Sequence, residues 1–320
     1  MLGKERHLAN IRQLTFGGQN AEAYFSPDGQ WLIFQSTRDG AACDQIYTMR
    51  IDGSGPRRLS SGRGRTTCAY VYPDGKRFLY ASTHLVSPDC PPAPDRSHGY
   101  VWGVFAFDIF SGSLDAPDSL KRLTDSSGYD AEATISPDGK TVVFTSDRDG
   151  DLELYTMDLE GRHQHRLTRR PGYDGGAFFS PDSKRLVYRA DHPEGAALAE
   201  YRSLLHQRLV RPTHMEIRVM DADGRNDRQV TRNGKANFAP YFHPDGKRIV
   251  FASNMLDPNG RAFELFLVGG DGRGLERVTF DGTFAAFPMF SPDGRKLVFA
   301  SNRNGKVPHE TNVFIADWVE

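Results

Sequence analysis

The chain has 320 residues, 40 basic and 41 acidic side chains, and a formal net charge of −1. This balance gives no support for nucleic-acid binding through bulk positive charge. No apolar run approaches membrane-spanning length, and no secretory signal is visible. The length exceeds that of a usual globular domain, but a ring of repeated units accommodates it without a second core.

Six Pro-Asp turns divide the chain into repeated units. Their prolines are Pro27, Pro73, Pro137, Pro181, Pro244 and Pro292. Proline presets φ for the second turn position, Asp accepts a local hydrogen bond, and the Gly that follows in five of the six takes the left-handed position. The prolines are 46, 64, 44, 63 and 48 residues apart. A period near 45 residues is typical of a β-propeller.

Runs of strand length, rich in β-branched and aromatic residues, surround each turn. In the first unit, residues 23–25 precede the turn and 31–34 follow it. Third strands are expected at 45–49, 103–107, 153–157, 216–220, 264–268 and 312–316. Fourth strands are expected at 57–60, 121–124, 165–168, 228–231 and 276–279. Four antiparallel strands per repeat describe one propeller blade.

The sixth unit ends after its third strand, whereas residues 11–15 have the pattern of a fourth strand before the first unit. We therefore expect the N-terminal strand to complete the last blade and close the ring, which removes free sheet edges. The predicted fold is all-β, a six-bladed propeller forming one domain over residues 1–320. Its blades cover about residues 21–60, 67–124, 131–168, 175–231, 237–279 and 286–318, the last completed by 11–15.

Two long insertions interrupt the repeat, at about residues 84–100 and 191–214. The first is rich in proline, and residues 194–210 of the second are a helix candidate. Its apolar residues at helical spacing are Leu198, Tyr201, Leu205 and Leu209. Strand alternation puts both insertions on the face that carries the connections between blades, here named the upper face. The Pro-Asp turns lie on the opposite, lower face. The insertions are expected to form a wall over the central channel or to cover an exposed blade top.

All three cysteines, Cys43, Cys68 and Cys90, fall between the first blade's second strand and the first insertion. We predict one disulfide, between Cys68 and Cys90, because the proline-rich loop around Cys90 needs an anchor. Such a bond implies an oxidising compartment. The alternative is three reduced, half-buried thiols. Zinc binding is not expected, since no Cys-x-x-Cys spacing occurs.

One position recurs just past the end of each second strand. It is occupied by Arg38, His84, Arg148, His192, Met255 and Arg303. Repeated arginines on a propeller top often bond to a neighbouring Asp or carbonyl, which is a structural role. They are also candidates for ligand binding. The histidines depart from the internal consensus, so His84 and His192 are candidates for catalysis or for weak metal binding, together with His309.

The starts of the innermost strands line the channel, where small residues are expected. Glu22 and Glu132 depart from this pattern and are candidates for acid–base or metal chemistry. Further candidates for ligand binding are Arg65, Tyr129, Tyr173 and Asn237. The alternative is that these groups hold ordered water and ion pairs in a polar channel.

The Ser-Pro-Asp-Gly turns, the loops at 147–150 and 302–305, and the pairing of Leu-Tyr-Thr-Met-Asp with Arg-Leu-Thr resemble the PD40 repeats of TolB-like β-propellers. The resemblance extends from about Ile11 to Trp318 and implies a bacterial-envelope protein. TolB also carries an N-terminal α/β domain, which does not precede the first blade here. The chain therefore looks like the stand-alone TolB-like propellers, and no Pal-contacting residues are transferred.

Oligogalacturonate lyases are similar in repeat style, and they hold a metal through histidines on one face. Upper-face histidines of this chain are His84, His98, His192, His206, His214 and His309. We expect an extracytoplasmic module that binds a protein, peptide or oligosaccharide on its upper face, without a cofactor. The alternative is a carbohydrate-active lyase or hydrolase with a divalent metal. No Gly-x-Ser-x-Gly or His-Glu-x-x-His motif is present.

Overall fold

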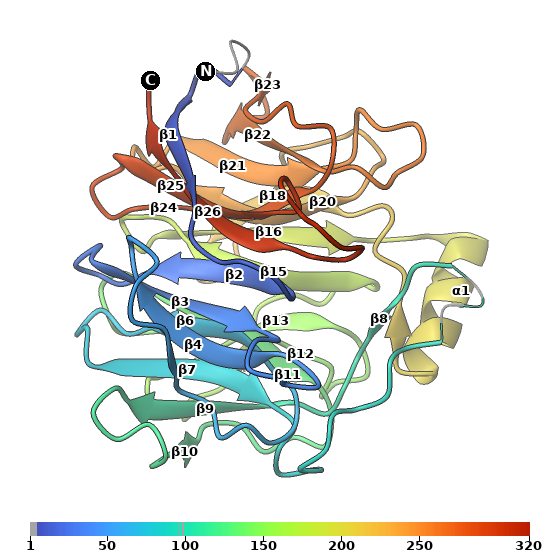
Figure 1. Cartoon of the computed structure of the whole chain (residues 1–320). Helices are drawn as coiled ribbons and strands as arrows, with labels where there is room; N and C mark the ends of the chain where they lie inside the picture. Colours follow the sequence, from blue (N-terminus) through green and yellow to red (C-terminus); the bar gives the residue numbers. More distant parts are fainter. Residues whose placement is uncertain (1–4, 96, 98) are drawn as a thin grey trace.

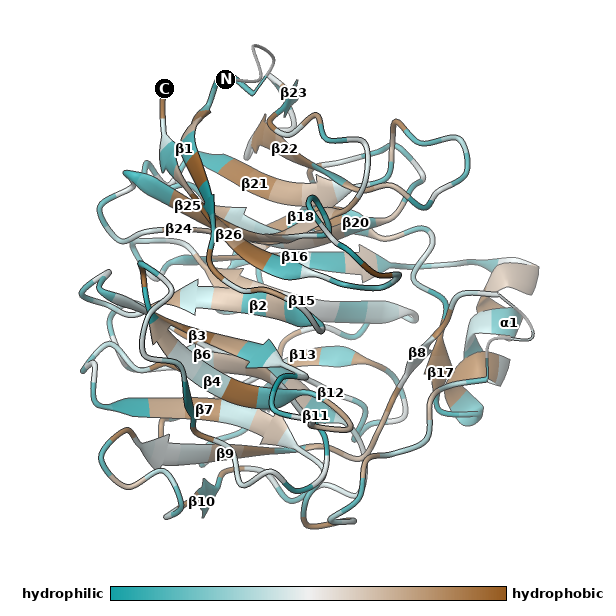
Figure 2. Cartoon of the chain, in the orientation of Figure 1, coloured by the Kyte–Doolittle hydropathy of each residue, from teal (hydrophilic) through white to brown (hydrophobic). Residues whose placement is uncertain are grey.

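The computed structural model describes residues 5–95, 97 and 99–320. In this part of the chain, six four-stranded antiparallel sheets form the blades of a ring. Each innermost strand contacts the innermost strands of both neighbouring blades, from the first blade to the sixth and back to the first. The predicted six-bladed propeller is therefore confirmed. Figure 2 shows apolar residues concentrated in the strands and polar ones at the loops, as expected for blades that bury their faces against each other.

The strands occupy four radial positions. The innermost strands, which face the axis, are β2 (Asn20–Phe25), β6 (Thr66–Val71), β11 (Asp130–Ile135), β15 (Tyr173–Phe179), β20 (Asn237–Phe242) and β24 (Ala285–Phe290). The second strands are β3 (Trp31–Ser36), β7 (Arg77–Ser82), β12 (Val142–Ser146), β16 (Arg185–Asp191), β21 (Arg248–Ser253) and β25 (Lys296–Ser301). The third strands are β4 (Gln45–Arg50), β9 (Asp108–Ser113), β13 (Glu153–Met157), β18 (Glu216–Asp221), β22 (Glu264–Gly269) and β26 (Asn312–Trp318).

The outermost strands are short in five blades and leave little unpaired edge. They are β5 (Arg57–Arg58), β10 (Lys121–Arg122), β14 (His165–Arg166), β19 (Arg228–Gln229) and β23 (Glu276–Arg277). In the sixth blade this place is taken by β1 (Leu8–Gln13), which pairs with β26. The two chain ends consequently lie side by side (Figure 1). The closing strand is thus confirmed. It begins at Leu8, three residues before the start expected from the pattern of residues 11–15.

The prediction of a third strand at residues 103–107 is wrong. The third strand of the second blade is β9, whose Ile109 and Phe110 are buried against β7. Residues 103–107 are apolar for a different reason. Val104 packs with Tyr201 and Val210 of the second insertion, and Phe107 packs against Ala81 and Ala131 of the second and third blades.

The two insertions are joined to each other. The helix α1 (Gly195–His206) leads into β17 (Leu209–Val210), and β17 pairs with β8 (Trp102–Gly103) of the first insertion. We name the unit of β8, α1 and β17 the clasp. Arg208 Nε donates to the carbonyl of Val104 at 2.9 Å. The hydroxyl of Tyr201 donates to Asp151 Oδ1 at 2.6 Å, which fastens the helix to the blades. The clasp stands at one side of the ring in Figure 1.

A buried ion pair reinforces ring closure. Glu5, just before β1, lies 3.0 Å from Arg303 of the β25–β26 loop, and both side chains are at least nine-tenths buried. Glu5 Oε1 also accepts the backbone N–H of Phe280 at 3.0 Å. We predict that Glu5→Ala lowers the free energy of unfolding by about 3 to 5 kcal/mol, because it leaves a buried guanidinium uncompensated.

The neighbouring Arg6 provides the matched control. Its ion pair with Glu276 is exposed, and such pairs contribute about 1 kcal/mol or less. Chemical denaturation of Glu5→Ala and Arg6→Ala measures both effects. Equal losses in the two variants would show that the buried pair does not hold the closure.

Candidate functional site

A ring of six β-bulges surrounds the axis. Each innermost strand contains one β-bulge, at which its register with the second strand of the blade shifts. The bulged residue is the third residue of the strand in five blades and the fourth in β15. The residue at each bulge has a left-handed backbone, with φ between 46° and 61°. These residues are Glu22, Cys68, Glu132, Gly176, Ala239 and Phe287. Five of them are not glycine and carry backbone strain, and bulges with such strain re-aim side chains near functional sites.

Below the bulges, aromatic rings meet across the axis. Tyr24 and Tyr70 of neighbouring blades lie 6.0 Å apart, and both contact Phe178 from the fourth blade, at 5.5 and 6.2 Å between ring centroids. Phe178 contacts Tyr241 of the fifth blade at 5.3 Å. These rings fill the lower part of the channel. The bulge residues above them keep partial exposure in four blades, so water reaches them from the upper face.

Glu132 is fully partnered. Its carboxylate accepts hydrogen bonds from Thr145 Oγ1 at 2.8 Å, Tyr173 Oη at 3.0 Å and the N–H of Gly176 at 2.9 Å. It also pairs with the guanidinium of Arg189. A Cβ on Gly176 would overlap that guanidinium, at 2.2 Å from Nη1, so the glycine leaves the space in which the pair forms.

Within the described residues, Glu22 has no ion pair and no comparable set of hydrogen-bond donors. Its carboxyl hydrogen-bonds to the thiol of Cys68. Enclosure in the channel raises the pKa of Glu22 to about 7, and the negative charge of Glu132 raises it further than the positive charge of Arg189 lowers it. Burial likewise raises the pKa of the Cys68 thiol well above its ordinary value. The two carboxylates of the channel therefore lie in opposite electrostatic environments.

An aromatic row continues from this cluster to the upper face. The guanidinium of Arg189 lies 5.2 Å from the ring of Trp102 in the clasp. Trp102 contacts Phe238 at 5.1 Å, and Phe238 stacks on Phe263 at 5.1 Å. Trp102 and Phe238 are partly exposed. The clasp thus delivers an aromatic side chain to the mouth of the channel.

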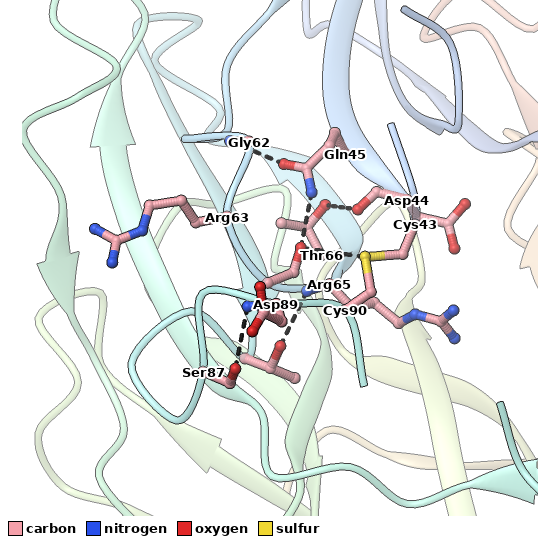
Figure 3. Close-up of a disulfide and its surroundings, with 12 residues drawn as sticks. Cys43, Asp44, Gln45, Gly62, Arg63, Arg65, Thr66, Ser87, Asp89 and Cys90 are labelled. Atoms are coloured by element: carbon pink, nitrogen blue, oxygen red, sulfur yellow. Dashed lines mark hydrogen bonds between the residues drawn. A yellow bond between two sulfur atoms is a disulfide. The ribbon is translucent and has the colours of Figure 1, made fainter. Parts of the chain in front are cut away.

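The disulfide joins Cys43 to Cys90, not Cys68 to Cys90 as predicted (Figure 3). Cys68 belongs to β6 and faces Glu22 at the axis, away from the proline-rich insertion. Cys43 lies 3.3 Å from the carbonyl of Gly64, and Gly64 donates its N–H to the carbonyl of Pro88 at 2.7 Å. The start of the insertion is therefore held beside Cys43. Bridging residues 47 apart stabilises the fold by about 4 kcal/mol in the chain-entropy description.

The basic residues that follow the second strands remain on their own blades. Arg148 donates to Asp130 Oδ1 at 2.8 Å and stacks on Tyr155. His192 bonds to Asp174 at 3.0 Å. Arg38 stacks on Phe34, and His84 bonds to Ser82 Oγ at 2.7 Å. With Arg303 paired to Glu5, these side chains brace the blade tops, and burial lowers the pKa of His84.

The other residues predicted to bind a ligand, Tyr173, Tyr129, Arg65 and Asn237, make contacts within the protein. Tyr173 belongs to the Glu132 cluster, Tyr129 packs against Phe107 at 5.9 Å, and Arg65 lies 5.4 Å over the ring of Phe105. Asn237 is buried and donates to the carbonyl of Met215 at 2.7 Å, so it is part of the scaffold.

Two upper-face histidines, His192 and His214, line one cavity with Asp191 and Glu216. Among the described residues, however, no group of three or more His, Cys, Asp or Glu is placed to hold a metal ion. His206, His214 and His309 are exposed on separate segments. His98 lies outside the described residues.

Arg189 and Trp102 were not predicted. Arg189 is detectable in the sequence, because the equivalent positions of the other second strands hold Gln35, Ala81, Thr145, Ala252 and Ala300. A buried arginine in this series indicates a charged partner. Trp102 lies in an insertion without an equivalent in other blades, so no internal comparison singles it out.

The upper face is rich in exposed apolar side chains. In the described part of the chain, eight large hydrophobic residues are exposed, and six belong to upper-face loops. These six, here named the apolar rim, are Phe16, Leu85, Val86, Tyr100, Leu256 and Val307. The two on the lower face are Leu275 and Val319. Concentration of apolar surface on one face is typical of interaction sites.

Comparison with known proteins agrees with this architecture. Residues 108–196 match the family PD40, described as TolB beta propeller domain. The Tol-Pal system protein TolB of Bordetella pertussis is 28% identical over 108 residues, covering 29% of this chain and 25% of the relative. The match thus spans a quarter of that relative's length.

Solved structures share the fold over nearly the whole chain. A putative TolB from Agrobacterium tumefaciens has a TM-score of 0.64 and 18% identity, with 97% of each chain covered. An oligogalacturonate lyase from Vibrio parahaemolyticus has a TM-score of 0.55 and 14% identity, covering 96% of this chain and 93% of the lyase. At these identities the likeness is one of fold.

The six four-stranded sheets and the contacts that close them into a ring define a six-bladed β-propeller, and both of its long insertions lie on the upper face. Within that class, residues 108–196 match the TolB beta propeller domain, and the whole chain is similar in fold to a solved putative TolB.

Thiol counting distinguishes the two disulfide pairings. In guanidinium without reductant, we expect one reactive thiol per wild-type chain, two in Cys43→Ser and none in Cys68→Ser, because Cys68 alone is free. The Cys68–Cys90 pairing would instead give none in Cys43→Ser and two in Cys68→Ser.

The pKa of Glu22 has a consequence for stability. Its ordinary value is 4.5, so the folded chain binds this proton more tightly than the unfolded chain. The stability contributed is present below pH 4.5 and is lost as pH rises to about 7. We predict that unfolding free energy of Glu22→Gln, relative to wild type, rises by about 2 to 3 kcal/mol between pH 4.5 and 8.

Urea denaturation across this pH range measures the difference. Glu160→Gln is the control, since Glu160 is an exposed lower-face carboxylate paired with Lys121. A constant difference between Glu22→Gln and wild type would show that Glu22 is ionised throughout.

Proposed function

We propose that this propeller is a non-enzymatic binding module of the bacterial envelope that holds a protein through its upper face. The apolar rim is the observation that carries the proposal. Its six residues come from three regions of the ring. They are the adjoining loops that carry Phe16 and Val307, the loop that carries Leu85, Val86 and Tyr100, and the loop that carries Leu256. A binding protein that covers the ring would bury all three at once, and a small ligand would not.

The clasp supports the same proposal. Together with the proline-rich loop, it borders a cavity of about 540 Å³. The cavity is lined by apolar residues such as Pro92, Phe105 and Leu204 and by charged ones such as Glu200 and Arg208. A mixed lining of this size suits side chains of a partner segment. The TolB relative is named as a component of the Tol-Pal system, which agrees with a role in assembly.

The Cys43–Cys90 bond supports an extracytoplasmic location, since disulfides persist in oxidising compartments. Among the described residues, no helix is long and apolar enough to cross a membrane.

A binding module is favoured over a lyase. The lyase hypothesis required upper-face histidines that converge on a metal, and within the described residues His84 and His192 are instead bonded inside their blades. The likeness to oligogalacturonate lyase extends to the fold.

Site-specific photo-crosslinking tests the upper face. A benzophenone amino acid at Val307 or Leu256 is expected to give a discrete protein adduct in native cells, and the same group at Leu275 to give none. Leu275 is the matched control, because it is exposed to 52% against 61% for Val307 but lies on the lower face.

Two results would overturn the proposal. One is equal crosslinking at Leu275 and Val307, which would indicate nonspecific collision. The other is cleavage of polygalacturonate by the purified protein, with loss of activity in His84→Ala or His192→Ala.

A further inference from the structure

Glu22 occupies a place in the channel that favours a positive charge. The groups that face it are Cys68 of β6, Glu132 of β11, Arg189 of β16, Asp44 before β4 and Tyr24 of its own strand. Two of these are acids and one is a base. The base is already committed, because the guanidinium of Arg189 pairs with Glu132 and contacts the hydroxyl of Tyr173 at 2.8 Å.

The second acid is committed as well. Asp44 lies near Arg65, whose positive charge opposes the rise that burial causes in the pKa of Asp44. Glu22 is therefore the one carboxylate of this cluster without a cationic neighbour of its own. Removing water from a carboxylate without a nearby cation is unfavourable, so a cation supplied from outside would stabilise it.

The chemistry around Glu22 favours an organic ammonium over a metal ion. The Glu132 oxygens are occupied by four hydrogen-bonded partners. A metal would find one carboxylate and a thiol that hydrogen-bonds to it, and no group of three ligating side chains occurs among the described residues. An ammonium needs only one carboxylate, and its carbon chain can pack on aromatic surface.

Access is from the upper face. The rings of Tyr24, Tyr70 and Phe178 fill the axis below Glu22. On the upper side of the bulges, Trp102 lies 5.2 Å from the guanidinium of Arg189 and 5.1 Å from Phe238, and both aromatic side chains are partly exposed. A side chain that enters from a protein seated on the apolar rim would pass these aromatic groups and end at Glu22.

We propose that Glu22 and the aromatic rings around it form a binding site for a primary ammonium group, supplied by a lysine side chain or by the N-terminus of the partner. This inference rests on the proposed function, since it names the group that the bound protein inserts. It also explains why a glutamate stands at position 22, where a small residue is expected beside the axis.

Carboxyl NMR of ¹³C-labelled glutamate tests the site directly. Glu22 is assigned by its loss in Glu22→Gln. The probes are n-butylammonium and, as its neutral counterpart, n-butanol. Butylammonium is expected to shift the Glu22 signal saturably and to lower the pKa of Glu22, while butanol leaves both unchanged.

The affinity for butylammonium should also follow the ionisation of Glu22. With a pKa of about 7, the ionised fraction is about tenfold larger at pH 8 than at pH 6, so the affinity rises about tenfold over this interval. Butylammonium remains protonated throughout. This pH dependence should disappear in Glu22→Gln and persist in Glu160→Gln, and thermal unfolding confirms that both variants fold.

Two further probes distinguish the source of the ammonium group. Nα-acetyl-lysinamide represents a lysine side chain, and alaninamide, studied below its own pKa at pH 7, represents an N-terminus. The probe that shifts the Glu22 signal at lower concentration identifies the source.

Some outcomes would overturn the inference. They are equal responses to butylammonium and butanol, a pH-independent affinity, or a saturable response to Ca²⁺ or Mn²⁺ with none to the amines. If crosslinks still form at Val307 in that case, the ammonium site fails alone and the binding of a protein stands. If the Val307 crosslinks are lost but the response to butylammonium is intact, the binding of a protein to the upper face fails and the ammonium site stands.

Discussion

The pairing of β1 with β26 is the constraint on which the rest of the structure depends. It joins the first and last parts of the chain in one sheet and so converts a row of blades into a ring. Only a closed ring brings the six innermost strands around one axis, places the six bulges at one level and lets Tyr24 of the first blade touch Phe178 of the fourth. The buried contact of Glu5 with Arg303 explains how a terminal strand remains in place.

The fold was predictable because its information is local and repeated. Each Pro-Asp turn reports one blade, and the same turn chemistry recurs as a hydrogen bond from the serine before the proline to the aspartate, for example from Ser26 to Asp28 and from Ser136 to Asp138. Where the repeat is interrupted, prediction failed. Residues 103–107 have the apolar pattern of a strand, but Val104 packs under the clasp and Phe107 packs against Ala81 and Ala131 of the blades. No local pattern distinguishes these kinds of burial.

The disulfide shows a second limit. Both Cys43 and Cys68 precede the proline-rich loop, and the sequence separation does not indicate which of them faces it. The choice is made by the bulge in β6, which turns Cys68 toward the axis, and by the contact of Gly64 with Pro88. Both are three-dimensional facts. The departures from the internal consensus had mixed value for the same reason. His84 and His192 are variants of a structural brace, and Glu132 is itself bound into the scaffold. Glu22 is the departure from the consensus that lacks such partners within the described residues.

Glu22 and Glu132 occupy equivalent bulges two blades apart, yet their surroundings give them different chemistry. The blade beside Glu132 supplies Arg189, Tyr173 and the N–H of Gly176, and this partnership can form because two glycines leave room for it. The blade beside Glu22 supplies the thiol of Cys68. The carboxylate of Glu132 is thereby a fixed part of the scaffold, and its negative charge raises the pKa of Glu22. Burial is the main cause of the raised pKa of Glu22, and the opposing charges of Glu132 and Arg189 adjust it. The identity of residue 189 is therefore relevant to the ionisation of Glu22, although Arg189 pairs with Glu132.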